Sequence, residues 1–383
     1  MVDSWLDDNT ANRHKQTYVK GFVDISGGDL VLRNGQQQFM DNSYNYSTTD
    51  ISDNSITSSQ EITVNPVWSQ LGNSVTPTSN SFYANDMSKD GTVIIVGERD
   101  ALSNQGIERV FQYTNNAWTQ LGDDLSGNNT GDKFGCSVSI NADGSIIAMG
   151  TYGVGGYCKV FEYDVAADGS WNQLGSDITG GTTAWFGHSL SLDASGHRLV
   201  VGDWNPGYGL IEVYDYDSAQ DSWSIVGSRI DIPTTSDANF GVKVMLSGDG
   251  STFLGGGNGY NSSQGMVAVY KYDDTVDGSW NQLGNILYGS STGVTLGEGG
   301  IASSYDGSII AMGEFSNDEA GTNRGKVYVY KYNTSTSSWD QLGEDIFGRE
   351  DASYLGQASI DLTDDGTILT MVETSGVTAH AGD

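Results

Sequence analysis

The chain has 383 residues, and 49 acidic residues outnumber 17 basic ones, which gives a formal net charge of −32. Such a surface repels nucleic-acid phosphates and anionic lipid headgroups, so we expect neither nucleic-acid binding nor membrane attachment. No apolar run approaches the roughly 20 residues that a membrane span needs, and 52 glycines with only 4 prolines suit many short strands joined by tight turns.

Residues 1–58 are predicted to form a small β module and a polar linker. Met1–Asp8 is polar and acidic, unlike a secretory signal. Tyr18–Gly35 reads as two strands around a Gly-Gly turn, with Asn34-Gly35 starting another turn. Asn42–Gln60 is rich in Ser, Thr, Asn and Asp, which is typical of a linker.

A tryptophan-led phrase, Trp-x-Gln-Leu-Gly, returns along the rest of the chain at intervals of 50 to 59 residues. One copy is altered and reads Trp-Ser-Ile-Val-Gly. The six repeat tryptophans are Trp68, Trp118, Trp171, Trp223, Trp280 and Trp339. A fixed period of this size predicts an array of similar units in one architecture, which we place at residues 59–383.

The second complete unit shows most clearly that each repeat holds four strands. Phe134–Ile140 alternates large and small residues, and Asp143-Gly144 is a hairpin-turn signal. Ile146–Gly150 reads as a strand buried on both faces, Tyr157–Tyr163 alternates again, and Trp171–Gly175 is the outermost strand. Four antiparallel strands in about fifty residues form one blade of a β-propeller. The fold class is therefore all-β, and the repeat tryptophans are expected to pack between blades.

The number of blades follows from the two ends of the array. Six copies of the first two strands occur, but only five copies have all four strands in order. At the other end, Glu61–Val64 and Trp68–Gly72 resemble a third and a fourth strand without the first two. We predict six blades, with the last blade built from both chain ends, because closure removes exposed edge strands. The alternative is a seven-bladed propeller whose last blade is missing.

The phrases Phe-Gly-x-Ser-Val-Ser-Ile, Asp-Gly-Ser-Ile-Ile-Ala-x-Gly and Gly-x-Val-x-Val-Tyr-x-Tyr together resemble the FG-GAP repeats of integrin-α-type β-propellers. The form that carries Trp-x-Gln-Leu-Gly is similar to proteins of marine microalgae and of the large viruses that infect them. Residues 18–35 resemble, over a short stretch, N-terminal modules of structural proteins in such viruses. The resemblance implies a fold and an adhesive or scaffolding habit, and it implies no particular chemistry.

Metal and cofactor binding is not expected from the repeat. Some FG-GAP repeats hold Ca²⁺ in an acidic loop, but Ser139–Ile147 carries one Asp where a hard cation wants 6–8 oxygen ligands. Longer acidic loops such as Glu314–Glu319 leave weak surface Ca²⁺ binding as the remaining expectation. His14, His188, His197 and His380 lack metal-ligand spacing, and His188 is interpreted as structural or facing the pore.

Catalytic signatures are also missing from the sequence. The Asp-Gly turns are not complete sialidase Asp-boxes, and the arginines are scattered singly. No nucleophile elbow or phosphate loop occurs. Cys136 and Cys158 are expected two inter-strand steps apart, which is too far for a disulfide.

Two tryptophans do not belong to the repeat series. Trp185 ends the loop that enters one blade, and Trp204 lies in the loop joining the second and third strands of that blade. Both loops leave the same end of a four-stranded meander, so the sequence predicts a ligand-binding cluster that suits sugar rings or a protein partner. Its members are Trp185, Asp203, Trp204, Asn205 and Tyr208. The alternative is that Trp185 only packs between blades.

We therefore expect a non-catalytic attachment protein on a virion surface, as a spike, fibre or capsid decoration. It would join other virion structural proteins through residues 1–58 and bind a host surface glycan or protein. A second hypothesis is a scaffold or adhesion propeller of a microalga, in the cytoplasm or outside the cell. A third is an enzyme acting on polysaccharides, for which Asp203 and His188 would be tested.

Overall fold

The computed structural model describes residues 70–374 except 80–81, 154, 166–168, 181–184, 205–208, 232–237 and 276–277, and the backbone of four strands nearer the N-terminus. The chain forms two compact units, Met1–Gln70 and Leu71–Asp383. The first unit contains two antiparallel pairs, β1 (Phe22–Asp24) with β2 (Val31–Arg33) and β3 (Tyr44–Thr49) with β4 (Ser59–Val64).

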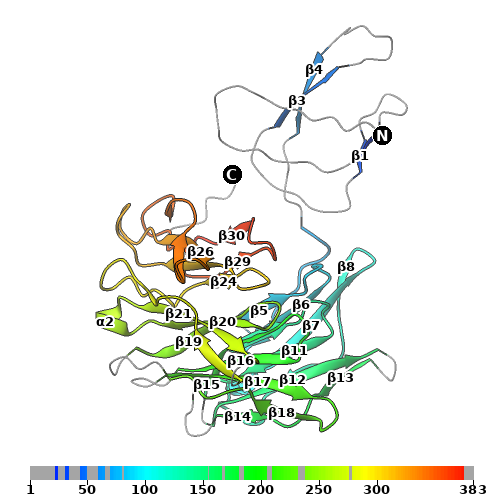
Figure 1. Cartoon of the computed structure of the whole chain (residues 1–383). Helices are drawn as coiled ribbons and strands as arrows, with labels where there is room; N and C mark the ends of the chain where they lie inside the picture. The colour runs from blue at the N-terminus through cyan, green and yellow to red at the C-terminus, as the bar shows by residue number, and fades with distance from the viewer. Residues whose placement is uncertain are drawn as a thin grey trace. The chain divides into compact units, whose positions relative to one another are not determined.

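The second unit consists of successive four-stranded antiparallel sheets, each a meander of consecutive strands (Figure 1). The first two sheets are β5 (Ala84–Met87), β6 (Val93–Glu98), β7 (Ile107–Thr114), β8 (Ala117–Gln120), and β10 (Ser137–Ile140), β11 (Ile146–Gly150), β12 (Tyr157–Asp164), β13 (Ser170–Gln173). The next two are β15 (Phe186–Leu192), β16 (Arg198–Asp203), β17 (Leu210–Asp217), β18 (Ser222–Ile225), and β19 (Phe240–Leu246), β20 (Thr252–Gly257), β21 (Met266–Asp273), β22 (Ser279–Gln282). The fifth is β24 (Ile301–Ser303), β25 (Ile309–Glu314), β26 (Lys326–Asn333), β27 (Ser338–Gln341).

Smaller elements complete these blades. Four two-residue strands pair with third strands, namely β9 (Leu125–Ser126), β14 (Ile178–Thr179), β23 (Leu287–Tyr288) and β28 (Ile346–Phe347). Two short turns labelled α1 (Ala101–Asn104) and α2 (Tyr260–Ser263) interrupt second-to-third-strand loops. The prediction of an all-β propeller with four-stranded antiparallel blades is confirmed.

The sixth position holds an inner strand pair. β29 (Ile360–Leu362) pairs with β30 (Leu369–Met371), and β29 packs beside the first strand of the fifth blade. The sequence assigned Glu61–Val64 to the outer part of this blade, whereas the structure pairs that stretch with β3. Trp68 lies outside the described residues, so completion of the sixth blade by the N-terminal segment stays a prediction.

The Asp-Gly turns between first and second strands meet at one end of the blades, which we call the turn end. Their backbones form a chain of hydrogen bonds from blade to blade: Lys89 N to Ala142 O (3.0 Å), Ala142 N to Ala194 O (3.1 Å), Ala194 N to Gly248 O (2.9 Å), Asp249 N to Tyr305 O (2.9 Å) and Tyr305 N to Asp364 O (2.9 Å). The Lys89 ammonium then pairs with the Asp364 carboxylate, which joins the sixth turn to the first.

At the opposite end, the loop end, neighbouring blades approach most closely at paired glycines. A Cβ built on Gly150 would lie 2.0 Å from the carbonyl oxygen of Gly187 in the next blade. The same relationship joins Gly97 to Gly135, Gly202 to Gly241, Gly256 to Gly297 and Gly313 to Gly356. Gly187 itself has a φ of +90°, which L side chains rarely adopt. The glycine of each Phe-Gly pair is therefore a steric requirement of blade packing.

The repeat tryptophans join the outer strands. The indole Nε1 of Trp171 donates a 2.8 Å hydrogen bond to the carbonyl oxygen of Leu121, in the preceding copy of the phrase. The other bonds are Trp118 to Leu71 (2.9 Å), Trp223 to Leu174 (2.9 Å), Trp280 to Val226 (3.1 Å) and Trp339 to Leu283 (2.9 Å). The altered copy still accepts this bond at Val226, because the acceptor belongs to the backbone.

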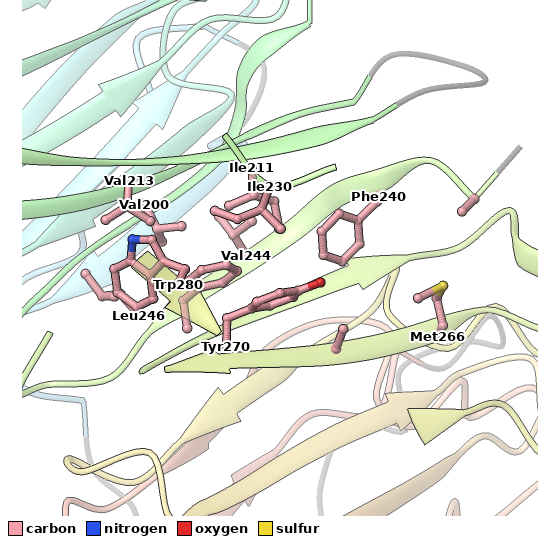
Figure 2. Close-up of a cluster of buried hydrophobic side chains, with 13 residues drawn as sticks. Val200, Ile211, Val213, Ile230, Phe240, Val244, Leu246, Met266, Tyr270 and Trp280 are labelled. Atoms are coloured by element: carbon pink, nitrogen blue, oxygen red, sulfur yellow. The ribbon is translucent and has the colours of Figure 1, made fainter. Parts of the chain in front are cut away.

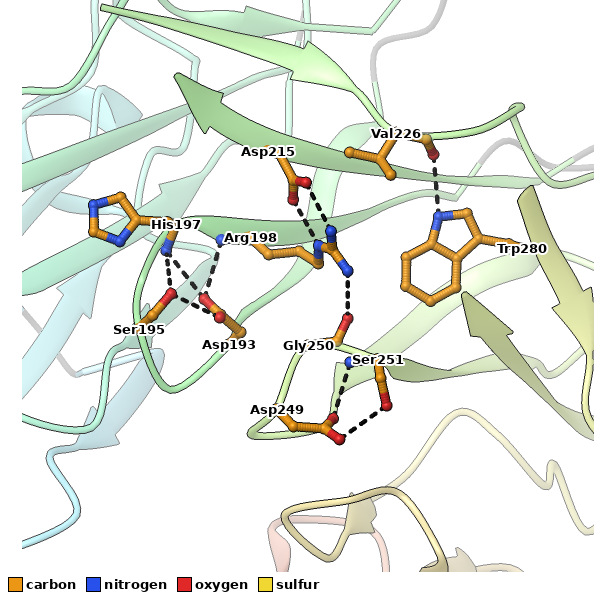
Figure 3. A network of polar contacts seen from close by, with 10 residues as sticks. All are labelled: Asp193, Ser195, His197, Arg198, Asp215, Val226, Asp249, Gly250, Ser251 and Trp280. Atoms are coloured by element: carbon orange, nitrogen blue, oxygen red, sulfur yellow. Dashed lines mark hydrogen bonds and ion pairs between the residues drawn. The ribbon is translucent and has the colours of Figure 1, made fainter. Parts of the chain in front are cut away.

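Hydrophobic cores lie between neighbouring blades. Between the third and fourth blades, Val200, Ile211 and Val213 face Phe240 and Trp280 (Figure 2). Figure 3 shows the polar network beside this core. Arg198 donates to both Asp215 oxygens (2.6 and 2.7 Å) and to the Gly250 carbonyl of the next blade (2.9 Å). The hydrogen bonds from Arg198 to Asp215 raise the pKa of the guanidinium further, so this ion pair persists at all physiological pH values.

Candidate functional site at the loop end

Three unlike side chains occupy the same position in successive blades. Each lies two residues after the glycine that ends the close approach between blades: Arg99 after Gly97, Tyr152 after Gly150 and Trp204 after Gly202. The chain leaves the second strand there and turns into the loop. Equivalent positions in neighbouring blades face one another, so these three side chains are brought to one part of the loop end.

A β-bulge adds a histidine to the same region. The register of β15 against β16 shifts between Phe186 and Ser189, and the backbone N–H of His188 donates to the Trp185 carbonyl at 3.1 Å. A bulge of this kind redirects the side chains around it. It places His188 and Trp185 beside the aromatic residues of the neighbouring loops.

Tyr152, Trp185, His188 and Trp204 form one group, which we call the aromatic cluster. The ring centroids of Tyr152 and Trp185 are 4.6 Å apart with nearly perpendicular planes (75°). Trp204 lies 5.0 Å from Trp185 and 6.4 Å from Tyr152. His188 lies 5.3 Å from Tyr152 and 5.1 Å from Trp204. All four side chains are half-buried, so the cluster keeps part of its surface in contact with solvent.

The His188 imidazole is neutral over the physiological range. Its pKa is lowered to about 4, mainly by burial and also by the nearby charges of Lys243 and Arg99, while a hydrogen bond with the Val242 backbone opposes the shift. Its Nδ1 atom and the Nε1 atom of Trp204 are buried and have no hydrogen-bond partner among the described residues. A neutral imidazole is a proton acceptor, and an unused indole N–H is a donor.

Two cations stand beside Tyr152. The guanidinium carbon of Arg99 lies 3.4 Å from the ring centroid of Tyr83 and 5.9 Å from that of Tyr152, and the Lys133 ammonium lies 5.6 Å from Tyr152. Arg99 Nε is buried without a hydrogen bond to any described residue, and its nearest carboxylate contact is Asp100 at 3.6 Å. The chain has a net charge of −32, so two basic side chains beside one ring at the loop end differ from the charge of the molecule as a whole.

Asp203 is buried, with 2% of its surface exposed, and does not lie on the open face of the aromatic cluster. The equivalent residues of the first and fifth blades are Glu98 and Glu314, which are equally buried. Glu98 accepts the backbone N–H groups of Thr78 and Ser79 at 2.8 Å each, and Glu314 accepts that of Ser290 at 2.6 Å. Glu98 and Glu314 thus anchor the loop that enters their blade. Asp203 occupies the equivalent position, so we expect it to have a structural role as well.

The structure brings together two of the residues that the sequence placed in a ligand-binding cluster. Trp185 and Trp204 are brought together as predicted, while Asn205 and Tyr208 lie outside the described residues. Sequence reasoning missed Tyr152, Arg99 and Lys133. Alignment of the blades on the glycine that ends the second strand would have found the first two, because they share the position of Trp204.

The acidic turns and loops are occupied by internal contacts. Asp143 accepts the backbone N–H and hydroxyl of Ser145, and the hydroxyl bond keeps the pKa of its carboxyl below its usual value. In the 314–319 loop, Glu314 accepts from Asn317 and Glu319 pairs with Lys326. Across the described ranges, no group of three or more His, Cys, Asp or Glu side chains is arranged to hold a metal ion.

Cys136 and Cys158 are free, buried thiols. Burial raises the pKa of Cys136 to about 12, so it stays a thiol at neutral pH. Two hollows lie at the outer strands of the blades. One of about 200 Å³ is bordered by Trp223, and one of about 330 Å³ by Leu342. Neither is bordered by a member of the aromatic cluster.

No protein-family model matches the chain, and no curated protein is similar to it in sequence. Its fold is similar to that of many solved structures. A "putative 6-phosphogluconolactonase" from Bacteroides uniformis ATCC 8492 is 14% identical over 76% of this chain and 77% of its own, with a TM-score of 0.52. A second, from Bacteroides fragilis NCTC 9343, is 13% identical over 76% of each chain, also with a TM-score of 0.52. None of the described helices is long and apolar enough to cross a membrane.

The expectation of a virion attachment protein is wrong. It rested on the resemblance of the repeats to adhesive propellers, whereas two solved structures of similar fold are each named a putative 6-phosphogluconolactonase, an enzyme. A four-stranded meander fixes how blades pack and leaves the loop end free to carry unrelated chemistry. The repeats therefore defined the fold and could not define the function.

Proposed function

We propose that the protein is an enzyme of β-propeller fold that hydrolyses a sugar lactone, a cyclic ester, at the aromatic cluster. The observation that carries this proposal is the neutral His188, whose ring lies beside Tyr152 and Trp204 and whose buried Nδ1 has no hydrogen-bond partner among the described residues. Aromatic faces bind the apolar faces of sugar rings, and a neutral imidazole is the commonest general base in proteins.

The chemistry requires one proton acceptor and one stabilised oxyanion. His188 would take a proton from water as the water oxygen attacks the lactone carbonyl carbon. The ring C–O bond then breaks, the proton passes to the departing ring oxygen, and the product is a hydroxy acid. Arg99, close enough to His188 for its charge to lower the pKa, would stabilise negative charge on the carbonyl oxygen.

The similar folds of the two Bacteroides proteins support a sugar lactone over other lactones, since each is named a putative 6-phosphogluconolactonase, an enzyme that acts on a sugar lactone. The proposal replaces the expectation of a non-catalytic protein. It rests on the geometry of the aromatic cluster, because identities of 13% and 14% carry no residue roles from one chain to another.

Hydrolysis of glucono-δ-lactone, followed as acid release above the spontaneous rate, tests this proposal. His188→Gln should reduce kcat by 10²-fold or more, about the contribution of general base catalysis. His197→Gln is the matched control, since His197 is exposed, belongs to the same blade and follows the turn at the other end. No turnover by the wild-type protein, or equal turnover by the two variants, would reject the proposal.

A further inference from the structure

The charges around the aromatic cluster suggest which sugars it binds. The chain has 17 basic and 49 acidic residues. A basic side chain is therefore commonly paired with a carboxylate. Arg109, Arg198, Arg324, Arg349 and Lys326 do so at ion-pair distance. The cations around Tyr152 depart from that pattern.

Lys133 and Lys243 form no ion pair with any carboxylate of the described chain. Arg99 reaches only its neighbour Asp100, at 3.6 Å, and its buried Nε makes no hydrogen bond to a described residue. The Arg99 guanidinium therefore has N–H donors available for another acceptor, such as an anionic ligand.

The aromatic rings also fix the position of these charges. Arg99 is stacked on Tyr83 and lies within reach of Tyr152, and Lys133 approaches Tyr152 from a different loop. Lys243 lies in the bulged first strand of the fourth blade and acts electrostatically on His188. Arg99 and Lys133, from two neighbouring blades, therefore both lie beside Tyr152.

We infer that Arg99 and Lys133 form an anion subsite next to the aromatic cluster, and that the ligand is a sugar bearing a carboxylate or a phosphoryl group. This inference deepens the proposed function and depends on the same site. Guanidinium groups bind both anions through paired N–H donors, while Tyr152 and the two tryptophans contact the apolar C–H groups of the sugar or sugar acid. An anion at this position would also favour protonation of His188 and make it a stronger base.

Binding is measured with four probes that need no turnover: glucose, gluconate, 6-phosphogluconate and inorganic phosphate. Titration calorimetry and tryptophan fluorescence give the dissociation constants. We expect gluconate or 6-phosphogluconate to bind at least tenfold more tightly than glucose. Equal affinity for gluconate and 6-phosphogluconate would assign the subsite to a carboxylate, whereas preference for 6-phosphogluconate with competition by phosphate would assign it to a phosphoryl group.

Arg99→Met and Lys133→Met should each weaken binding of the preferred acid at least tenfold and leave glucose unchanged. Arg229→Met, which removes an exposed arginine paired with Asp231, is the control and should bind as the wild type does. Unchanged thermal unfolding midpoints show that the variants fold. Equal affinity for glucose and the acids, or unchanged binding in both variants, overturns the inference.

The two proposals fail in different ways. Loss of lactone turnover with retained, Arg99-dependent binding of the acids would reject the enzyme and keep the anion subsite. Turnover of glucono-δ-lactone that survives in Lys133→Met, together with no preference for acids, would keep the enzyme and reject the subsite.

Discussion

The ring of Trp204 lies 5.0 Å from the ring of Trp185, at an angle of 72°, although one follows a second strand and the other precedes a first strand. Neither tryptophan belongs to the repeat, and both lie at the loop end, where the glycine pairs bring adjacent blades together. Tyr152 of the preceding blade completes the contact. The packing of blades thus positions a cluster whose residues vary freely from blade to blade.

The tryptophan hydrogen bonds between outer strands should contribute measurably to stability. Trp171→Phe keeps an aromatic ring and removes the 2.8 Å bond to the Leu121 carbonyl. We expect the free energy of unfolding to fall by about 1–2 kcal/mol. Leu71→Val, which keeps its carbonyl acceptor and alters an exposed side chain, should change stability by less than about 0.5 kcal/mol. Equal losses in urea denaturation would contradict the role of these bonds.

His188 makes the fold less stable in acid. Its pKa is about 4 in the folded protein and near 6.5 when unfolded, so below pH 6.5 the unfolded chain binds a proton that the folded protein does not. Stability should fall as pH drops from about 6.5 to about 4, by at most about 3 kcal/mol. In His188→Gln this dependence should disappear when unfolding is followed by circular dichroism.

Asp86 has the opposite effect in the same range. Burial raises its pKa to about 6 in the folded protein, whereas hydrogen bonds from the backbone of Ile140 and Met87 oppose the shift. Between about pH 4 and pH 6 the unfolded chain loses a proton that the folded protein keeps, so stability should fall as pH rises. In Asp86→Asn this opposing effect is absent, so the free energy of unfolding should fall more steeply than in the wild type as pH drops through the range in which His188 acts. A variant with the pH profile of the wild type would show that Asp86 titrates normally.

Glu108 is the most costly buried group of the first blade. It is fully buried, neither carboxylate oxygen has a hydrogen-bond partner among the described residues, and burial raises its pKa well above the usual value. The equivalent position opposite the second-strand glycine holds Ile211 in the third blade. Glu108→Ile should stabilise the protein at pH 7–8 by about 1–3 kcal/mol, because an unpartnered polar group is removed from the core. A loss of stability in thermal denaturation at that pH would contradict this account.

The fold could be predicted from the sequence because its determinants are local and repeated. Each Asp-Gly turn, Phe-Gly pair and tryptophan phrase recurs at a fixed spacing, and each has a role that the backbone geometry defines. The copy at Trp223 could lose its Gln and Leu because the next tryptophan, Trp280, donates to the backbone carbonyl of Val226 and needs no particular side chain there.

The site was only partly predictable. Trp185 and Trp204 were found because they depart from the repeat, but Tyr152 and Arg99 look like ordinary loop residues until the blades are aligned on their glycines. The state of His188 depends on burial between neighbouring blades, which no spacing rule gives. Asp203 is likewise buried, with 2% of its surface exposed, which its position in the sequence does not indicate.

The central claim is that the aromatic cluster is the substrate site, and a crystal structure of the protein soaked with gluconate tests it most directly. The account predicts the sugar acid lying against the solvent-facing side of Trp185, Trp204 and Tyr152, with its carboxylate toward Arg99. Gluconate bound in an outer-strand hollow beside Trp223 or Leu342, or an unoccupied cluster at saturating gluconate, would contradict it.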